Sequence, residues 1–388
     1  RLAWASAGGV LVDEAVFAAT RNEVAYRDAP VELTLKGQPQ AVPAWTLAAR
    51  VEYRGRLGAI AGRAAEVAML RRLWAEASQD CRGNCVIVEG ESGTGKTSLS
   101  VELWRHVETT DGTFRVATAT AVDRETPFSA LRRLVMDVLG ISSAMTLDER
   151  RAAVLANLPA TLHPLAPLLD AVFPSGLGDN EQTADIQGQA RTEAIEDLLI
   201  DTLHHAFGGR AVCLCIDDAQ WLDLASIRLL SRLLDRVSHL LLVILTQPSA
   251  DQRWMDDLVN EGAHRLRLPP LDRGGVIELI RRRLGVPEVD EALVAQVLQI
   301  AQGHPFFTAE LVSSMETKGA LRIDGTRARL SEVAATDPVA LPETLHGMIL
   351  QRLDRPEPEQ QLTARVAAVV GEVFPTRIVC DIHPTETG

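Results

Sequence analysis

The chain has 388 residues, 46% of them hydrophobic, and a formal net charge of −13 from 39 basic and 52 acidic side chains. This length predicts two or three domains with substantial apolar cores. The acidic balance argues against a broad nucleic-acid or anionic-membrane surface. No apolar run approaches the ~20 residues of a membrane span, so we expect a cytoplasmic protein without a membrane partner.

Residues 1–50 are predicted to be the end of one domain, followed by a linker over 51–60. Apolar runs predict strands at 9–12, 31–35 and 41–45, with a short helix over 13–21. Pro43 predicts an edge position for the last strand, because proline cannot donate to a ladder. The chain starts without methionine, and we expect it to be a piece of a longer polypeptide.

A glycine-rich loop lies between a predicted strand over 85–88 and a predicted helix that begins at Ser98. The loop has the sequence Gly90-Glu91-Ser92-Gly93-Thr94-Gly95-Lys96-Thr97. It fits the phosphate-loop pattern G-x-x-x-x-G-K-[ST], in which backbone N–H groups turn around an anion. Lys96 would supply charge for the β- and γ-phosphates and Thr97 a hydroxyl for Mg²⁺. Together with the N-terminus of the helix that begins at Ser98, the loop predicts a nucleotide site.

Strands and helices alternate up to about residue 250, which predicts an α/β fold with a mainly parallel sheet. The expected order is a strand at 114–118, a helix at 127–138, a polar, proline-dotted stretch to about 183, a helix at 191–207, a strand at 211–216, a helix at 224–237 and a strand at 241–245. After 264–268 the pattern is helical, at 275–284, 290–301, 306–315, 341–353 and 361–370, with a hairpin around Asp324-Gly325. We therefore expect a P-loop domain over 61–250, an all-α region over 251–335 and a further domain starting at 336.

Two aspartates follow the apolar strand at 211–216. Asp217 lies at its carboxyl end, where open α/β sheets place their ligands. Asp217 is predicted to hold Mg²⁺ through water, and Asp218 to position or deprotonate the attacking water. The alternative is that both aspartates only open a loop or cap the next helix, for which Asp223 is the better candidate.

The cysteines do not describe a disulfide framework, because five is an odd number. Cys81 and Cys85 lack a second pair at zinc spacing. Cys213 and Cys215 alternate in an apolar run, which places both on one side of a strand. We expect small buried or free thiols in a reducing cytosol.

The run 217–223, with the sequence DDAQWLD, resembles the second nucleotide motif of the STAND class of AAA-type signalling ATPases, close to the origin-recognition-like ATPase domain. Further motifs agree in order over about residues 60–375. They are Gly62-Arg63 with Glu66, Thr126-Pro127-Phe128, the lid motif Gly303-His304-Pro305-Phe306-Phe307 with Glu310-Leu311, and Leu341-Pro342 with Gln351-Arg352-Leu353-Asp354 at the start of a winged-helix-like domain.

This resemblance implies binding of ATP or ADP with Mg²⁺, and ATP hydrolysis by a regulatory module. It places Pro305 near the adenine. Gln247 stands where the family often has an arginine that senses phosphate, so slow hydrolysis is expected. The alternatives are a non-hydrolysing ATP- or ADP-binding scaffold and the ATPase module of a DNA-binding transcriptional regulator. The expected partners are other domains of the same polypeptide or further copies of it, and no nucleic acid.

The amino-terminal piece resembles the carboxyl end of a class III adenylate or guanylate cyclase domain. The segments that carry the match are 8–15 and 33–37, with Pro43-Ala44-Trp45. The resemblance implies a bacterial signalling protein in which a cyclase precedes the ATPase. The metal-binding aspartates and the asparagine of such a domain would lie upstream of Arg1, so this piece alone is not expected to make a cyclic nucleotide.

Other polar side chains have simpler explanations. His304 is expected to cap or pack against its helix, and His204-His205 to complement a helix dipole. The run 281–283, three arginines, is expected to be a solvated face, and Trp221 a packing residue against the sheet.

Overall fold

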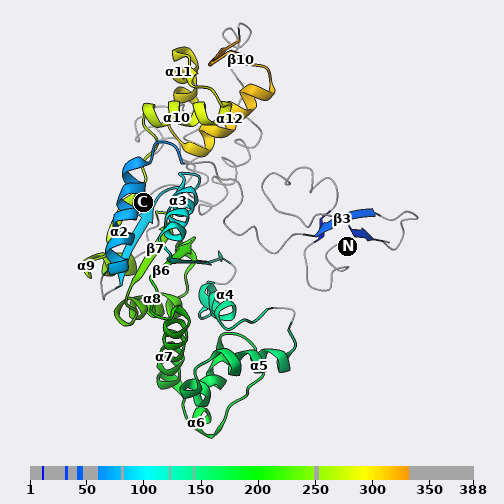
Figure 1. The fold of residues 1–388 in the computed structure, drawn as a ribbon, viewed down its shortest axis with the longest axis vertical. Coiled ribbons are helices and arrows are strands. Elements are labelled where there is room, and N and C mark those ends of the chain that lie inside the picture. Colours follow the sequence, from blue (N-terminus) through cyan, green and yellow to red (C-terminus); the bar gives the residue numbers. More distant parts are fainter. Residues whose placement is uncertain are drawn as a thin grey trace, which may run out of the picture. The chain divides into compact units, whose positions relative to one another are not determined.

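The computed structural model describes residues 60–79, 83–121, 124–142, 145–248 and 253–331, together with three amino-terminal strands. The chain divides into two compact units, Arg1–Pro269 and Pro270–Gly388, shown in Figure 1. The described helices include none with both the length and the apolarity needed to cross a membrane. The predicted helix over 13–21 and the predicted winged-helix-like segment over 336–388 lie outside the described residues.

The amino-terminal strands form a small antiparallel sheet. Its order is β1 (Leu11–Val12), β3 (Val42–Thr46), β2 (Val31–Leu33). The prediction that Pro43 marks an edge strand is wrong, because β3 lies in the middle. Pro43 is opposite Glu32 of β2, whereas β1 pairs further along, at Trp45 and Thr46. Proline has no N–H to donate, and at Pro43 the described part of β3 has a neighbouring strand on one side only.

The main sheet of the first unit has five parallel strands, which confirms the α/β class. Their order is β5 (Thr113–Thr118), β6 (Val212–Asp217), β7 (Leu240–Thr246), β4 (Asn84–Glu89), β8 (His264–Arg267). All seven residues of β7 are buried, as expected for a parallel strand covered on both faces. Because β7 separates β4 from β6, the carboxyl ends of these three strands lie side by side.

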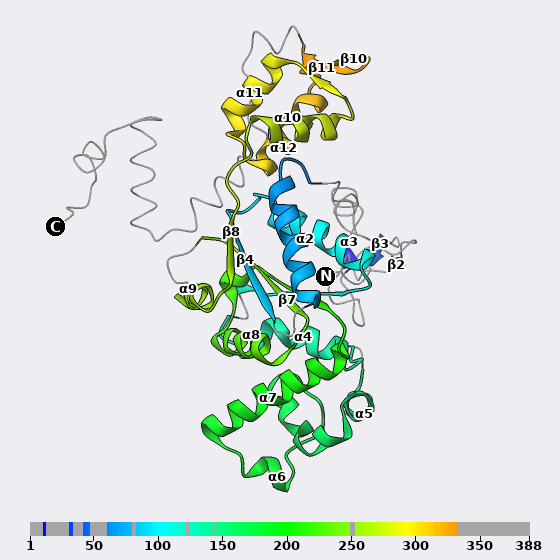
Figure 2. The ribbon, with the colours of Figure 1, turned by 60° about the vertical axis from the view of Figure 1, so that its left-hand side comes forward.

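Helices cover both faces of this sheet and build two cores. On one face, α2 (Ala64–Gln79) and α3 (Lys96–Thr109) pack Leu73 and Leu99 against Val86 of β4 (Figure 2). The other face carries α4 (Ser129–Val138), α7 (Gly188–Phe207), α8 (Leu224–Arg236) and α9 (Arg253–Asn260). Ile87 of β4 belongs to this second core together with Leu131 and Leu199. Successive residues of β4 thus serve opposite cores, as the alternation of a strand requires.

The segment 139–183, predicted only as a polar, proline-dotted stretch, contains helices. It contains α5 (Leu147–Asn157), the 3₁₀ helix η3 (Ala160–Ala171) and α6 (Glu181–Ala184), and η3 contacts α5, α6 and α7. A capping box between Thr146 and Glu149 opens α5. Pro164 and Pro167 lie inside η3. A 3₁₀ run of 12 residues is unusually long, and the sequence analysis assigned no element to it.

The second unit combines helices with a small sheet. It contains α10 (Arg273–Leu284), β9 (Glu288–Val289), α11 (Glu291–Ala301), α12 (Pro305–Thr317), β10 (Leu321–Asp324) and β11 (Arg327–Leu330). The hairpin predicted at Asp324-Gly325 is β10–β11, and β9 adds to it in parallel, so this part is not all-α. Since β8 pairs with β4, the first unit extends beyond residue 250 to Pro269.

Candidate nucleotide site

The glycine loop lies between the end of β4 and the start of α3. Gly93 and Gly95 have φ angles of +80° and +98°, a conformation that side chains disfavour. At Gly90, a Cβ would lie 2.6 Å from Thr94 Oγ1. That hydroxyl donates to the carbonyl of Glu91 at 2.8 Å and closes the turn. The glycines are therefore required by the shape of the loop itself.

Lys96 is held inside this loop. It is the first residue of α3 and only 7% exposed, and its Nζ donates to the carbonyls of Gly90 at 2.7 Å and Glu91 at 2.9 Å. Gly95 provides no side chain to cap α3, so the first N–H groups of the helix can serve an anion. Thr97, also in the first turn, is exposed. A buried ammonium beside helix N–H groups has the chemistry of a phosphate site.

The two aspartates lie at the same edge of the sheet, at the carboxyl end of β6. Only β7 separates β6 from β4, which corresponds to about 10 Å between those two strands. Asp217 Oδ1 accepts the N–H of Asp218 at 3.0 Å. Asp218 has a φ of +55°, a left-handed conformation that costs about 1–2 kcal/mol for a residue other than glycine. Strain of this kind is often retained at functional sites.

Gln247 follows β7, between the loop and the aspartates. Its N–H donates to Gln220 Oε1 at 3.2 Å. Thr246, the last residue of β7, accepts the N–H of Gly90 at 3.1 Å through its carbonyl. The structure thus brings the phosphate loop, Gln247 and the aspartates together. Pro305 belongs to the other unit, at the first residue of α12, and its place near adenine stays a prediction.

Several simpler interpretations are confirmed. Asp223 caps α8 by accepting the N–H of Ser226 at 2.8 Å, so this cap does not involve Asp217 or Asp218. His304 caps α12 through the N–H of Phe307 and stacks on that ring at 4.2 Å. Trp221 packs against the core. His204 and His205 lie in the last turn of α7, and the three arginines at 281–283 lie in the last turn of α10.

Three cysteines of the described part are buried free thiols. Cys213 and Cys215 face the same core, as predicted from their spacing. Burial raises the pKa of Cys85 to about 12 and also raises that of Cys213. Burial and, after it, the charge of Asp217 raise the pKa of Cys215. Because only the thiolate is reactive, these groups are packing residues.

Arg63 supports the phosphate loop, a role that the sequence did not reveal. It is 3% exposed and pairs with Glu66 at 3.0 Å. Its Nη2 also donates to the carbonyls of Thr94, in the loop, and of Pro269. The family resemblance includes Gly62-Arg63 but gives Arg63 no function. Its three partners show that it links the start of α2 to the loop and to the end of the first unit.

Glu89, the last residue of β4, joins the loop's strand to β8. Its carboxylate accepts hydrogen bonds from Arg265 at 3.1 Å and Arg267 at 3.0 Å. Burial alone raises the pKa of Glu89, but the two arginines outweigh burial and hold the pKa below its usual 4.5. An acidic residue that ends an apolar strand was the only sequence signal for this pair of contacts.

Glu89→Gln is expected to destabilise the first unit by about 1–3 kcal/mol at neutral pH, because two charged hydrogen bonds are weakened. A depressed folded pKa contributes stability above pH 4.5, and this is lost as the pH falls through the folded value. The difference between wild type and variant should therefore shrink below pH 4.5 in urea unfolding. Glu76→Gln, in an exposed pair with Arg72, is the control and should change little. A difference that persists unchanged at pH 3 would contradict the assignment.

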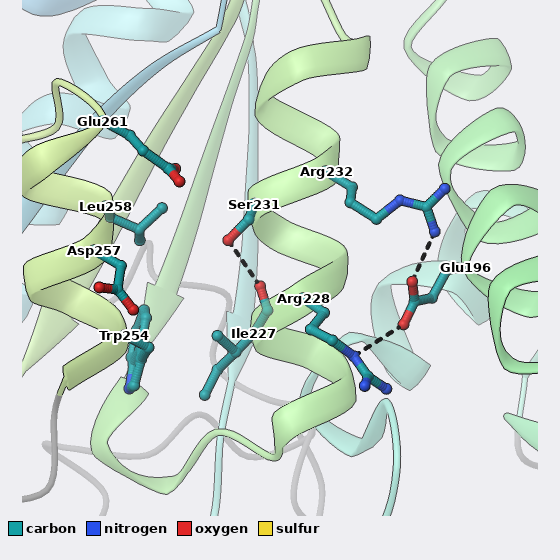
Figure 3. Close-up of a pocket in the computed structure, with 9 residues that line it drawn as sticks. All are labelled: Glu196, Ile227, Arg228, Ser231, Arg232, Trp254, Asp257, Leu258 and Glu261. Carbon is teal, nitrogen blue, oxygen red and sulfur yellow. Dashed lines mark hydrogen bonds and ion pairs between the residues drawn. The ribbon is translucent and has the colours of Figure 1, made fainter. Parts of the chain in front are cut away.

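A separate hollow of about 380 Å³ lies between α7, α8 and α9 (Figure 3). Figure 3 shows Trp254, Leu258 and Ile227 on one side and Glu196 between Arg228 and Arg232 on the other. Glu196 accepts from Arg232 at 2.7 Å and lies 3.3 Å from Arg228. None of the predicted site residues lines this hollow.

The glycine loop with its buried lysine and the paired aspartates lie in a stretch of the chain that is similar to a known family. Residues 59–244 match the family model of the AAA ATPase domain. This match includes the phosphate loop and both aspartates, and it supports the coarser part of the resemblance, an AAA ATPase domain over these residues. Residues 276–329 match the model of a domain of unknown function (DUF8739). No curated protein matches the chain.

Solved structures with similarity to the chain have low sequence identity. The ORC1 protein of Aeropyrum pernix in complex with DNA is 16% identical, with a TM-score of 0.42 over 83% of this chain and 82% of that chain. Drosophila ORC bound to DNA is 14% identical, with a TM-score of 0.43 over 82% and 72%. A RuvB mutant of Thermotoga maritima is 13% identical, with a TM-score of 0.38 over 83% and 82%. These likenesses assign no role to any residue of this chain.

Proposed function

We propose that the first unit binds Mg-ATP at the Gly90–Thr97 loop and hydrolyses it slowly, as a STAND-type regulatory module. The observation that carries the proposal is the buried Lys96, whose Nζ is 2.7 Å from the carbonyl of Gly90 inside a glycine loop at a helix N-terminus. The paired aspartates on the same sheet edge and the AAA ATPase family match support it.

Each side chain has a distinct task in this proposal. The loop N–H groups and Lys96 would bind the phosphates. Thr97 and Asp217 would hold Mg²⁺, which would supply positive charge to the phosphate oxygens. Asp218 orients the water and accepts its proton. Gln247 offers a hydrogen bond but no positive charge to the phosphates. The site therefore lacks the stabilisation of the transition-state charge that an arginine would provide. Hydrolysis is therefore slow.

Regulation would require that the nucleotide bind one arrangement of the two units more tightly than another. A nucleotide can move the second unit only by as much as it prefers one arrangement of the two units over the other. Contact between adenine and Pro305 is the proposed source of that preference. In the parent protein, the module would control a cyclase domain that precedes it, and the strands at 11–12, 31–33 and 42–46 would be the end of that domain.

Thermal unfolding with and without Mg-ATP tests nucleotide binding. At about 100 times the dissociation constant, the nucleotide should stabilise the wild type by about 2.7 kcal/mol. Lys96→Ala should remove most of this stabilisation, since it deletes the only ammonium in the loop. No shift of the unfolding temperature in the wild type, or an equal shift in the variant, would contradict the proposal.

A non-hydrolysing scaffold that holds ATP or ADP is the second candidate, and Gln247 is the observation that favours it. The two candidates differ in phosphate release. The scaffold predicts that wild type and Asp218→Asn release phosphate at the same background rate, whereas the ATPase predicts a faster wild type. Both predict the same stabilisation by nucleotide.

A further inference from the structure

Gln220 connects two parts of the proposed site through one side-chain amide. It lies in the 3₁₀ turn η4 (Ala219–Trp221) that follows the aspartates. Its Nε2 donates to Asp218 Oδ1 at 3.0 Å, and its Oε1 accepts the N–H of Gln247 at 3.2 Å. The reversed amide would face a donor with a donor and an acceptor with an acceptor, so both contacts together fix its orientation.

The first contact fixes one oxygen of Asp218. The backbone of this residue is already constrained, because its N–H is bound by Asp217 Oδ1 and its φ is +55°. Since Oδ1 already accepts from the glutamine amide, Oδ2 is the oxygen with more acceptor capacity left for a water. A general base must be placed within hydrogen-bond reach of its proton, and a misplacement of about 1 Å can cost 100-fold in rate.

The second contact ties this geometry to the end of β7. Gln247 directly follows Thr246, whose carbonyl accepts the N–H of Gly90 in the phosphate loop. A continuous path therefore runs from the loop through β7 and the Gln220 amide to Asp218. A displacement at the end of β7 would move the carboxylate with it.

We propose that Gln220 is a positioning residue that holds the Asp218 carboxylate in register with the end of β7, so that hydrolysis depends on both of its hydrogen bonds. This inference rests on the proposed ATPase function. It assigns Gln220 a role in the rate of hydrolysis and none in holding the nucleotide.

Gln220→Glu separates the two contacts. Glutamate keeps an acceptor for the Gln247 N–H but replaces the donor to Asp218 by a like charge. We expect kcat for phosphate release to fall about 10–100-fold, with the Mg-ATP dissociation constant unchanged within about twofold. Gln182→Glu, an equal charge change at an exposed position in α6, is the control and should leave kcat unchanged.

A double variant shows whether the effect runs through Asp218. Asp218→Asn with Gln220→Glu should be no slower than Asp218→Asn alone, because the residue being positioned no longer acts as a base. Additive losses would indicate a general structural role and overturn the inference. Gln220→Leu removes both contacts and gives a second reading: a loss of Mg-ATP binding in both single variants would also overturn it.

The two proposals fail in different ways. If Gln220→Glu hydrolyses ATP like the wild type while Asp218→Asn does not, the positioning role is wrong and the ATPase stands. If neither the wild type nor Asp218→Asn releases phosphate above background, hydrolysis itself is absent and both proposals are wrong. The expected result is a slow Gln220→Glu that binds Mg-ATP normally.

Discussion

Asp218→Asn is expected to reduce phosphate release about 10²–10⁴-fold while the protein continues to bind Mg-ATP. Asparagine keeps the shape of aspartate and an oxygen that can accept from Gln220, 3.0 Å away in the wild type. It cannot take up the proton of an attacking water at neutral pH. The loss should therefore appear in the rate and not in affinity.

Single-turnover phosphate release, measured beside a nucleotide titration, checks this prediction. Asp201→Asn is the matched control, an exposed aspartate of α7 that should leave the rate unchanged. Equal rates for wild type and Asp218→Asn would remove Asp218 from the mechanism. A parallel loss of nucleotide binding would instead indicate that the substitution disturbs the whole sheet edge.

Gly303→Ala is expected to destabilise the second unit by more than about 2 kcal/mol. Gly303 has a φ of +75°, and a Cβ there would lie 2.3 Å from the carbonyl oxygen of Leu271. That oxygen belongs to backbone and cannot swing aside. The same two residues are joined by a 2.7 Å hydrogen bond from the Leu271 N–H to the Gly303 carbonyl, so separation of the two segments would strain this bond.

Gly319→Ala provides the control for backbone conformation. Its φ is +67°, and a Cβ there would meet no atom within 4 Å. The difference between the two alanine variants isolates the collision with Leu271. All six tryptophans precede Pro270, so their fluorescence reports the first unit while circular dichroism reports both. A Gly303→Ala variant whose circular-dichroism midpoint equals that of Gly319→Ala would contradict the prediction.

The sequence predicted those parts of the site that depend on neighbouring residues. The loop at Gly90–Thr97, the aspartates after β6 and the cap by Asp223 are local patterns, because their chemistry is determined within a few positions of the chain. The helix N-terminal role of His304 is local in the same way. Each could be recognised without knowledge of the strand order.

The contacts that organise the site are long-range and escaped prediction. Gln220 reaches Gln247 across 27 positions, and Glu89 reaches Arg267 across 178. Both pairings depend on β7 lying between β6 and β4 and on β8 lying beside β4, an order that alternating strand patterns do not specify. Pro164 and Pro167 concealed η3, since proline is usually taken as a break in regular structure.

Calorimetric titration with Mg-ATP tests the central claim, that the Gly90–Thr97 loop is a nucleotide site. The account predicts one site per chain in the wild type. It also predicts at least about 100-fold weaker binding by Lys96→Ala, equivalent to about 2.7 kcal/mol and within reach of two charge-assisted hydrogen bonds. A wild type that takes up no Mg-ATP, or a Lys96→Ala variant that binds it as tightly, would contradict the account.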